Sequence, residues 1–199
     1  SQAMNAAASL FERAPLPVPA AIIATVLAAY RSPPRAYHGL DHVAEVLAHW
    51  RSVAEGPGWR QPVETWLALL FHDAVYEPGR RDNEAMSAAL ARHEIESHPS
   101  CSTIDVERVC TLIELTAAHG RHVPGALDDD AAMLLDCDMA ILGATPERFD
   151  AYDAAIAAEY RDVVPAWMYR INRRRFLKRL LGLPSVFLSP YFQSRFELA

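Results

Sequence analysis

An apolar run, Trp66–Phe71, leads directly into His72 and Asp73. The run predicts a buried helix, so an imidazole and a carboxylate stand side by side at its inner end. Adjacent side chains of one helix point in different directions, and we expect a third body, such as a metal ion, to bring this pair together. The alternative is a histidine and an aspartate that are hydrated at a frayed helix end.

Two further residues have the same character, because they lie in or beside apolar stretches of other predicted helices. They are His42, near the start of one helix, and Asp138, inside the apolar segment Ala131–Leu142. A buried carboxylate is costly unless it is paired, and one divalent cation would satisfy several of these groups at once. Two imidazoles and two carboxylates suit Mn, Fe, Co, Ni or Zn, or Mg with more water.

Asp136 competes with Asp138 for the last place in this set. The two aspartates are two residues apart, so a helix cannot direct both at one point. Whichever of them is not a ligand needs a separate partner, for which an arginine is a candidate.

Helical periodicity dominates the chain and no alternating strand pattern is convincing, so the predicted fold class is all-α. The candidate ligands belong to predicted helices that run from about residue 40 to before Gly56, from Pro62 to Asp73, and over 131–142. We expect a break at Ser32-Pro33-Pro34 and a loop at Leu127–Asp130. The other predicted helices cover about 5–13, 19–30, 82–98, 102–119, 146–161, 165–181 and 189–198.

The length of 199 residues predicts one compact helical domain over 1–199. Its core is expected to cover about 18–182, followed by a C-terminal tail, 183–199. No internal repeat or linker divides the chain. The sequence leaves the oligomeric state open, a homo-oligomer included.

The composition excludes several classes of protein. A net charge of −6 argues against nucleic acid as the main partner, and the basic run Arg170–Arg179 is expected to be a solvated helix face. Three cysteines without a CxxC motif indicate no disulfide framework. Because the sequence shows neither a signal peptide nor an apolar run near ~20 residues, we expect a cytoplasmic protein with no membrane segment and no membrane as a partner.

The order His…His-Asp…Asp on successive helices resembles the HD superfamily of metal-dependent phosphohydrolases. Further segments are similar to one branch of that superfamily, which consists of predicted phosphohydrolases of about this length. The similarity covers most of the chain, roughly Arg35 to Arg175. The segments are Tyr37–His42, Phe71–Tyr76, Asp82–Glu84 with Ser87-Ala88, Thr116–His119, Leu135–Asp138 with Ile141–Gly143, and Glu159-Tyr160.

The resemblance implies a single HD-like helical bundle that holds one divalent metal ion. The implied ligands are His42, His72, Asp73 and Asp138. Such an ion would lower the pKa of a bound water and neutralise charge on a phosphoryl oxygen. For the catalytic carboxylate that orients the water, we consider Glu84 and Glu77, which closely follow the His-Asp pair, together with Asp73. Glu84 could equally be a carboxylate that the helix dipole favours.

The expected substrate is a small phosphorylated compound, nucleotides included, and the choice between a phosphomonoester and a phosphodiester stays open. Candidate substrate-binding residues are His38, Arg35, Arg81 and His119. Arginine guanidinium groups suit phosphate.

Two other functions remain as alternatives. A di-iron oxygenase on the same scaffold would need a second metal held by His98 and His119. A non-catalytic regulatory module would keep the ion for structural reasons only.

Overall fold

The computed structural model describes the backbone of residues 2–31 and 35–197 and the side chains of 7–31 and 35–197. The described residues form α-helices and short 3₁₀ helices but no strand, which confirms the all-α fold. The break predicted at Ser32-Pro33-Pro34 lies outside the described residues, as does Leu198. The elements are α1 (Gln2–Phe11), α2 (Ala20–Arg31), α3 (Leu40–Glu55), α4 (Pro62–Phe71), α5 (Asn83–Glu96), η1 (Pro99–Cys101), α6 (Val106–Leu115), η2 (Thr116–Ala118), α7 (Asp129–Met139), η3 (Ala140–Gly143), α8 (Pro146–Tyr160), α9 (Ala166–Leu181) and α10 (Pro190–Phe196).

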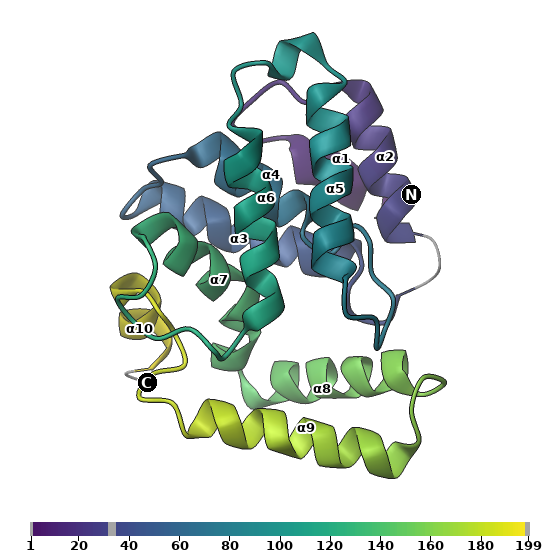
Figure 1. Cartoon of the computed structure of the whole chain (residues 1–199), viewed down its shortest axis with the longest axis vertical. Helices are drawn as coiled ribbons and strands as arrows, with labels where there is room; N and C mark the ends of the chain where they lie inside the picture. Colours follow the sequence, from purple (N-terminus) through teal and green to yellow (C-terminus); the bar gives the residue numbers. More distant parts are fainter. Residues whose placement is uncertain (1, 32–34, 198–199) are drawn as a thin grey trace.

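The helices form a main body and a hairpin at one end of it. Helices α3 to α7 pack together in the main body, with α1 and α2 beside them, whereas α8 and α9 run side by side along one end (Figure 1). Helix α10 returns to pack against α7 and η3.

Helix α4 lies at the centre of the main body. It contacts α3, α5, α6 and α7, and every residue from Thr65 to Phe71 is buried. A helix that is apolar on all sides is stable only in such surroundings. The carboxyl end of α4 therefore delivers the next two residues, His72 and Asp73, into the interior.

The predicted starts of α6 and α7 are wrong, and in both cases an aspartate sets the true boundary. Helix α6 starts after Asp105, whose carboxylate accepts a hydrogen bond from the backbone N–H of Arg108, rather than near residue 102. Helix α7 starts after Asp128, which accepts from the N–H of Ala131 at 2.9 Å, where a loop was predicted. An aspartate at the N-cap accepts a hydrogen bond from a free helical N–H. An acidic segment that was predicted to be a loop can therefore contain the start of a helix.

The segment predicted as a C-terminal tail contributes to the core. Phe187 and Phe192 are buried and belong to the same hydrophobic cluster as α3, α4 and α7. In addition, Glu197 accepts hydrogen bonds from the backbone N–H groups of Val186 and Phe187. The sequence did not predict this burial because Leu183-Pro184 separates the segment from the last long helix.

Candidate metal centre

The His-Asp pair converges at the point where α4 ends. His72 is the C-cap residue, and the chain then turns, so that the N–H of Ala74 bonds to the carbonyl of Phe71. The Nε2 atom of His72 consequently lies 2.9 Å from Oδ2 of Asp73. Because α4 ends at Phe71, Asp73 no longer follows the helix geometry, and the two side chains can point to the same place. That a metal ion lies between them stays a prediction.

A backbone hydrogen bond fixes the orientation of the His72 ring. Its Nδ1 atom lies 2.6 Å from the carbonyl oxygen of Leu69, so Nδ1 carries the proton and donates it to that carbonyl. A carbonyl partner on one ring nitrogen is the usual arrangement for a histidine that binds metal through the other. The Nε2 atom of His72 is therefore presented to the centre of the site.

His42 and Asp138 complete the group from two other helices. His42 is buried in the first turn of α3, and its Nε2 atom lies 3.0 Å from Oδ1 of Asp138. Asp138 stands in the last turn of α7, and its Oδ1 atom is also 3.1 Å from Nε2 of His72. Between Asp136 and Asp138, the geometry thus selects Asp138 as the member of the group.

The spacing of these atoms suits one metal ion. One ligand atom from each of His42, His72, Asp73 and Asp138 can be chosen so that all lie within 4.8 Å of one another. The distances between imidazole Nε2 atoms and carboxylate oxygens are 2.9–3.4 Å. Adjacent ligands of a metal with bonds of about 2.1 Å are separated by roughly 3.0–3.4 Å in octahedral or tetrahedral geometry. The described residues therefore contain a His/Asp cluster that could hold a metal ion.

The electrostatics of the group favour ionised carboxylates. Burial alone would raise the pKa of Asp73 and Asp138, but the neighbouring imidazoles, with His72 the largest contributor, lower both. Burial would also lower the pKa of His42, yet its hydrogen bonds with Asp138 and Asp73 raise that pKa to about 9. Metal ligands must be deprotonated. The carboxylates are already ionised when a cation enters, whereas the imidazole nitrogens that bind it must first lose their protons.

His119 lies against the far side of Asp138. Its Nε2 atom is 2.5 Å from Oδ2 of Asp138, while Oδ1 faces His42 and His72. The side chain of His119 is 20% exposed. His119 thus lies next to a candidate ligand, and its contact with a substrate stays a prediction.

His98, by contrast, forms its hydrogen bond with the end of α5 and does not belong to the ligand group. Its Nδ1 atom lies 2.7 Å from the carbonyl of Glu94 at the end of α5, and it is not a member of the candidate ligand set. The structure therefore does not bring His98 and His119 together as the two histidines of a second metal site would require.

His38 is held beside the group by a carboxylate that the sequence analysis did not assign to it. Glu159 of α8 accepts hydrogen bonds from the backbone N–H groups of Tyr37 and His38 at 2.8 and 2.9 Å. Its second oxygen lies 2.6 Å from Nδ1 of His38. Burial raises the pKa of Glu159, but these bonds, led by the one with His38, outweigh it and lower the pKa. A histidine 121 residues before its partner gave no sequence signal beyond the family resemblance.

Arg35 positions the site rather than facing solvent. Its two terminal nitrogens donate to the carbonyl oxygens of Ala29, His38, Asp73 and Ala74. The guanidinium thus ties the end of α2 and the Tyr37–His38 turn to the backbone that follows α4. With these donors used by carbonyls, the contacts support a structural role and not the predicted phosphate contact.

The remaining predicted residues lie outside the ligand group. The Glu77 side chain is 71% exposed and faces Arg80, and Glu84 is half-buried in the first turn of α5. Arg81 is exposed. Their predicted roles, catalytic for the two glutamates and substrate-binding for Arg81, remain predictions.

Asp136 has partners that differ from the expected arginine. Its carboxylate accepts hydrogen bonds from the N–H groups of Leu188 and Ser189 and from the Ser189 hydroxyl, at 2.5–2.8 Å. Burial still raises its pKa to about 6. Asp136 thus anchors the C-terminal segment, whereas Asp138, two residues later, faces the histidines.

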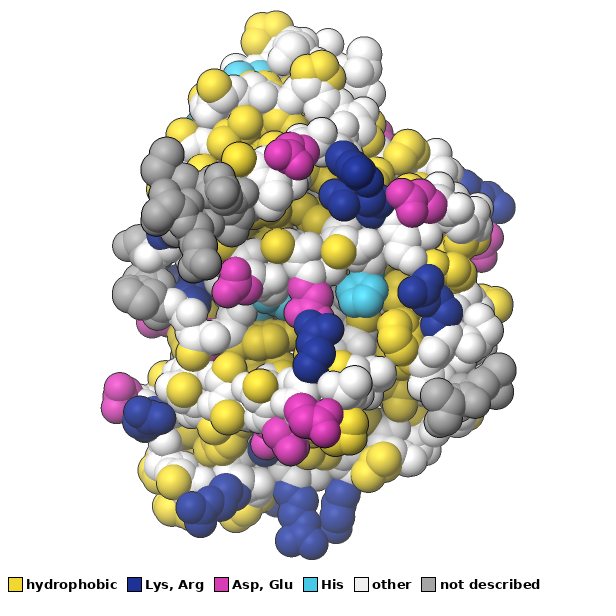
Figure 2. Space-filling view, turned by 180° about the vertical axis from the view of Figure 1, so that it is seen from behind, with side chains coloured by type: hydrophobic (Ala, Val, Ile, Leu, Met, Phe, Trp, Pro, Cys, Tyr) yellow, Lys and Arg dark blue, Asp and Glu magenta, His cyan; other side chains and the backbone are white. Residues whose placement is uncertain are grey.

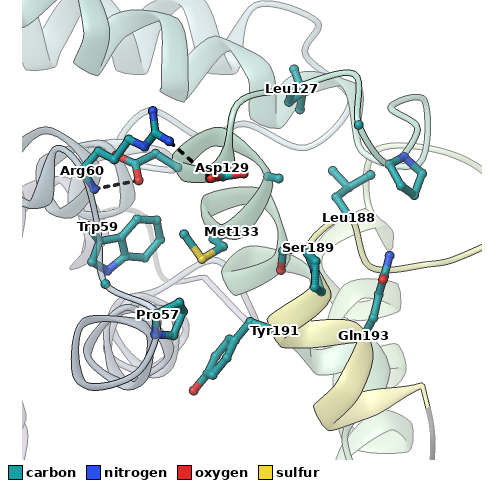
Figure 3. A pocket seen from close by; sticks show the side chains of 16 residues that line it. Pro57, Trp59, Arg60, Leu127, Asp129, Met133, Leu188, Ser189, Tyr191 and Gln193 are labelled. Carbon is teal, nitrogen blue, oxygen red and sulfur yellow. Dashed lines mark hydrogen bonds and ion pairs between the residues drawn. The ribbon is translucent and has the colours of Figure 1, made fainter.

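A separate cavity of about 620 Å³ lies between the 57–60 turn, the first half of α7 and α10. Trp59, Met133 and Tyr191 are among the side chains around it, with Arg60 and Asp129 paired at one side (Figure 3). None of the predicted site residues lines it. We place the candidate functional site at the His/Asp cluster, because the cavity lacks a comparable set of converging polar groups.

On another face of the molecule, His and acidic side chains reach the surface together above the α8–α9 end (Figure 2).

No protein-family model, curated protein or solved structure matches the chain. Among the helices of the described residues, none has the length and apolarity needed to cross a membrane.

Proposed function

We propose that this protein is a metal-dependent phosphohydrolase of the HD type, which cleaves a phosphate ester of a small molecule. The observation that carries the proposal is the group of two imidazole and two carboxylate ligand atoms, gathered from α3, the end of α4 and α7 within 4.8 Å. The order of these ligands along the chain is also the one that resembles the HD superfamily. Nucleotides are one candidate class of substrate.

His42, His72, Asp73 and Asp138 would hold one divalent ion. When bound, such an ion supplies a water of lowered pKa and neutralises charge on a phosphoryl oxygen. The carbonyl of Leu69 and the Oδ2 contact of Asp138 with His119 orient these ligands from outside. Partners of this kind hold a ligand set in place before the substrate arrives.

His38 and Glu159 are suited to handle a proton next to the ion and the substrate. Glu159 fixes the Nδ1 side of the ring, and the His38 side chain is 19% exposed, which leaves Nε2 to face a bound molecule. An imidazole oriented by a carboxylate can exchange a proton at its other nitrogen. In this proposal His38 assists the leaving group, in keeping with its predicted contact with substrate.

The test is metal content and phosphate release measured on one set of variants. Purified wild-type protein, with no metal added, is analysed by mass spectrometry beside Asp138→Ala and Asp129→Ala. These two aspartates share α7, but Asp129 lies at its start with a side chain that is 78% exposed. We expect about one equivalent of divalent metal in the wild type and in Asp129→Ala, and a loss of most of it in Asp138→Ala.

The same three proteins are then assayed for phosphate release from nucleoside phosphates, sugar phosphates and a nitrophenyl phosphodiester. Release that depends on Asp138 and not on Asp129 would support the proposal. Wild-type protein that takes up no divalent ion would contradict the metal centre. Protein that binds the ion but releases no phosphate from the panel would favour the non-catalytic module.

A further inference from the structure

Helix α9 exposes apolar side chains to a degree not found elsewhere in the described residues. Seven large hydrophobic side chains are exposed, and five of them lie between residues 163 and 181. Trp167 is 61% exposed and Leu181 is 84% exposed. Single exposed hydrophobic residues are ordinary, but a concentration of them marks a surface that contacts another apolar phase. These five residues are Val163, Trp167, Met168, Ile171 and Leu181.

The same helix concentrates positive charge. Its 16 residues include six Arg or Lys and no Asp or Glu, although the net charge of the whole chain is −6. Only Arg173, which points inward, forms an ion pair within the part of the chain that the structure describes, with Asp153 of α8 at 2.8 Å. Lys and Arg side chains gather along the edge of the molecule that α9 forms (Figure 2). The other five basic residues are Arg170, Arg174, Arg175, Lys178 and Arg179.

Helical geometry places three of the exposed apolar residues and three of the basic residues of α9 on one side. Tyr169, Arg173, Phe176 and Leu180 are the more buried positions and face inward. The opposite side, which we call the α9 face, has apolar residues at both ends and basic residues between them. Its ends, Trp167 and Leu181, are separated by about 21 Å along the helix. The α9 face consists of Trp167, Ile171, Arg174, Arg175, Lys178 and Leu181.

We infer that the α9 face binds the surface of an anionic lipid bilayer, with α9 lying parallel to the membrane plane. Trp167, Ile171 and Leu181 would enter the interfacial region, and the basic residues between them would contact anionic headgroups. A helix with basic residues and exposed Trp and aliphatic side chains is suited to this position. The negative charge of the rest of the chain favours one orientation, because an anionic surface repels it and attracts α9.

Charge and shape favour a bilayer over the other candidate occupants. A second copy that packed its own α9 face against this one would bring two strongly basic helices together, which is unfavourable. A nucleic acid would use the basic residues through its phosphates but would leave Ile171 and Leu181 in water. Helix α9 lies at the outer edge of one end of the molecule (Figure 1). The residues of the α9 face are exposed along its length, so a flat surface could reach them. This inference is independent of the proposed enzymatic function.

The test is sedimentation of the full chain with vesicles of phosphatidylcholine alone or with about 30% phosphatidylserine. We expect binding to the anionic vesicles only, and a decrease as salt rises, because salt screens exposed charges. The double variant Arg174→Glu/Arg175→Glu changes the charge of the α9 face by four, and its partitioning is expected to fall about a hundredfold. The matched control, Arg13→Glu/Arg60→Glu, changes the net charge equally at exposed positions outside α9.

Tryptophan fluorescence gives an independent measurement of contact with the bilayer. Trp167 is the most exposed of the four tryptophans, so its burial in the interface should shift the emission to shorter wavelength. Trp167→Phe should remove the shift, and circular dichroism verifies that each variant folds. The inference is overturned if the wild type does not bind anionic vesicles at low salt, or if the control variant loses binding as completely as the α9 variant. Two other results would also overturn it, provided that vesicles leave the Trp167 emission unchanged. One is self-association through the α9 face in sedimentation velocity, and the other is binding of RNA to that face.

Discussion

Helices α4 and α9 contrast in how they relate to the rest of the molecule. In α4 the last seven of ten residues are buried, and the helix ends at the His72–Asp73 pair. In α9 only Leu180 of 16 residues is buried, and the outward side mixes basic and apolar groups. Because side chains in a close-packed interior have few alternative positions, α4 can fix the positions of the two ligand residues that follow it. Helix α9 does not fix its outward side chains in this way, and instead exposes the α9 face to solvent.

Helix α8 joins these two regions. On one side Glu159 bonds to the Tyr37–His38 turn next to the candidate metal centre, and on the other Asp153 pairs with Arg173 of α9. Packing accompanies these polar contacts, since the ring centroids of Tyr37 and Tyr152 lie 4.8 Å apart. Because α9 is mostly exposed whereas α4 is buried, we expect the two regions to differ in stability and in their dependence on metal.

The largest expected difference concerns packing. Leu67→Ala in α4 removes a side chain that is 1% exposed, and the resulting cavity should lower the free energy of unfolding by about 2–5 kcal/mol. Ile171→Ala in α9 removes a side chain that is 44% exposed and should change it by less than about 0.5 kcal/mol. Urea denaturation of both variants measures the difference. Similar losses in the two would show that α9 is part of the cooperative core.

Metal binding should stabilise the main body alone. A divalent ion at about 100 times its Kd should raise the free energy of unfolding by about 2.7 kcal/mol. Asp138→Ala should abolish this gain, because the carboxylate faces both His42 and His72, whereas Asp153→Ala on α8 should keep it. The measurement is thermal unfolding with and without a chelator. A gain that survives Asp138→Ala would place the ion elsewhere.

The attachment of the hairpin should contribute least. Glu159→Gln removes the carboxylate next to His38 and should lower the free energy of unfolding by about 1 kcal/mol near neutral pH. Because folding lowers the pKa of Glu159, its contribution is complete above the unfolded pKa, about 4.3, and is lost as the pH falls through the folded value. The difference between wild type and variant should therefore shrink below about pH 4.3. A difference that grows with acidity would contradict this assignment.

The sequence predicted most of the fold, because its information is local. Apolar periodicity and prolines located the helices, and the failures at α6 and α7 were boundaries set by the N-caps Asp105 and Asp128. The burial of Phe187 and Phe192 was not predicted. It depends on a return of the chain to α7, and such long-range packing leaves no periodic signal in a short segment.

The residues of the candidate site likewise divide into those that the sequence could predict and those whose partners depend on long-range packing. His42, His72, Asp73 and Asp138 could be proposed from residue type, apolar context and order along the chain, and the structure brings them together. Residue type and spacing alone left Asp136 and Asp138 open, and only the family resemblance implied Asp138. The sequence predicted neither the carbonyl partners of Arg35 nor the histidine partner of Glu159. Those outcomes depend on which chain segment arrives opposite each side chain. Asp136 meets the backbone of Leu188 and Ser189, and Asp138 meets imidazoles from three other segments. The sequence therefore determined which groups were available for chemistry, and the tertiary structure decided their partners, because a partner is fixed by packing between distant segments and not by spacing along the chain.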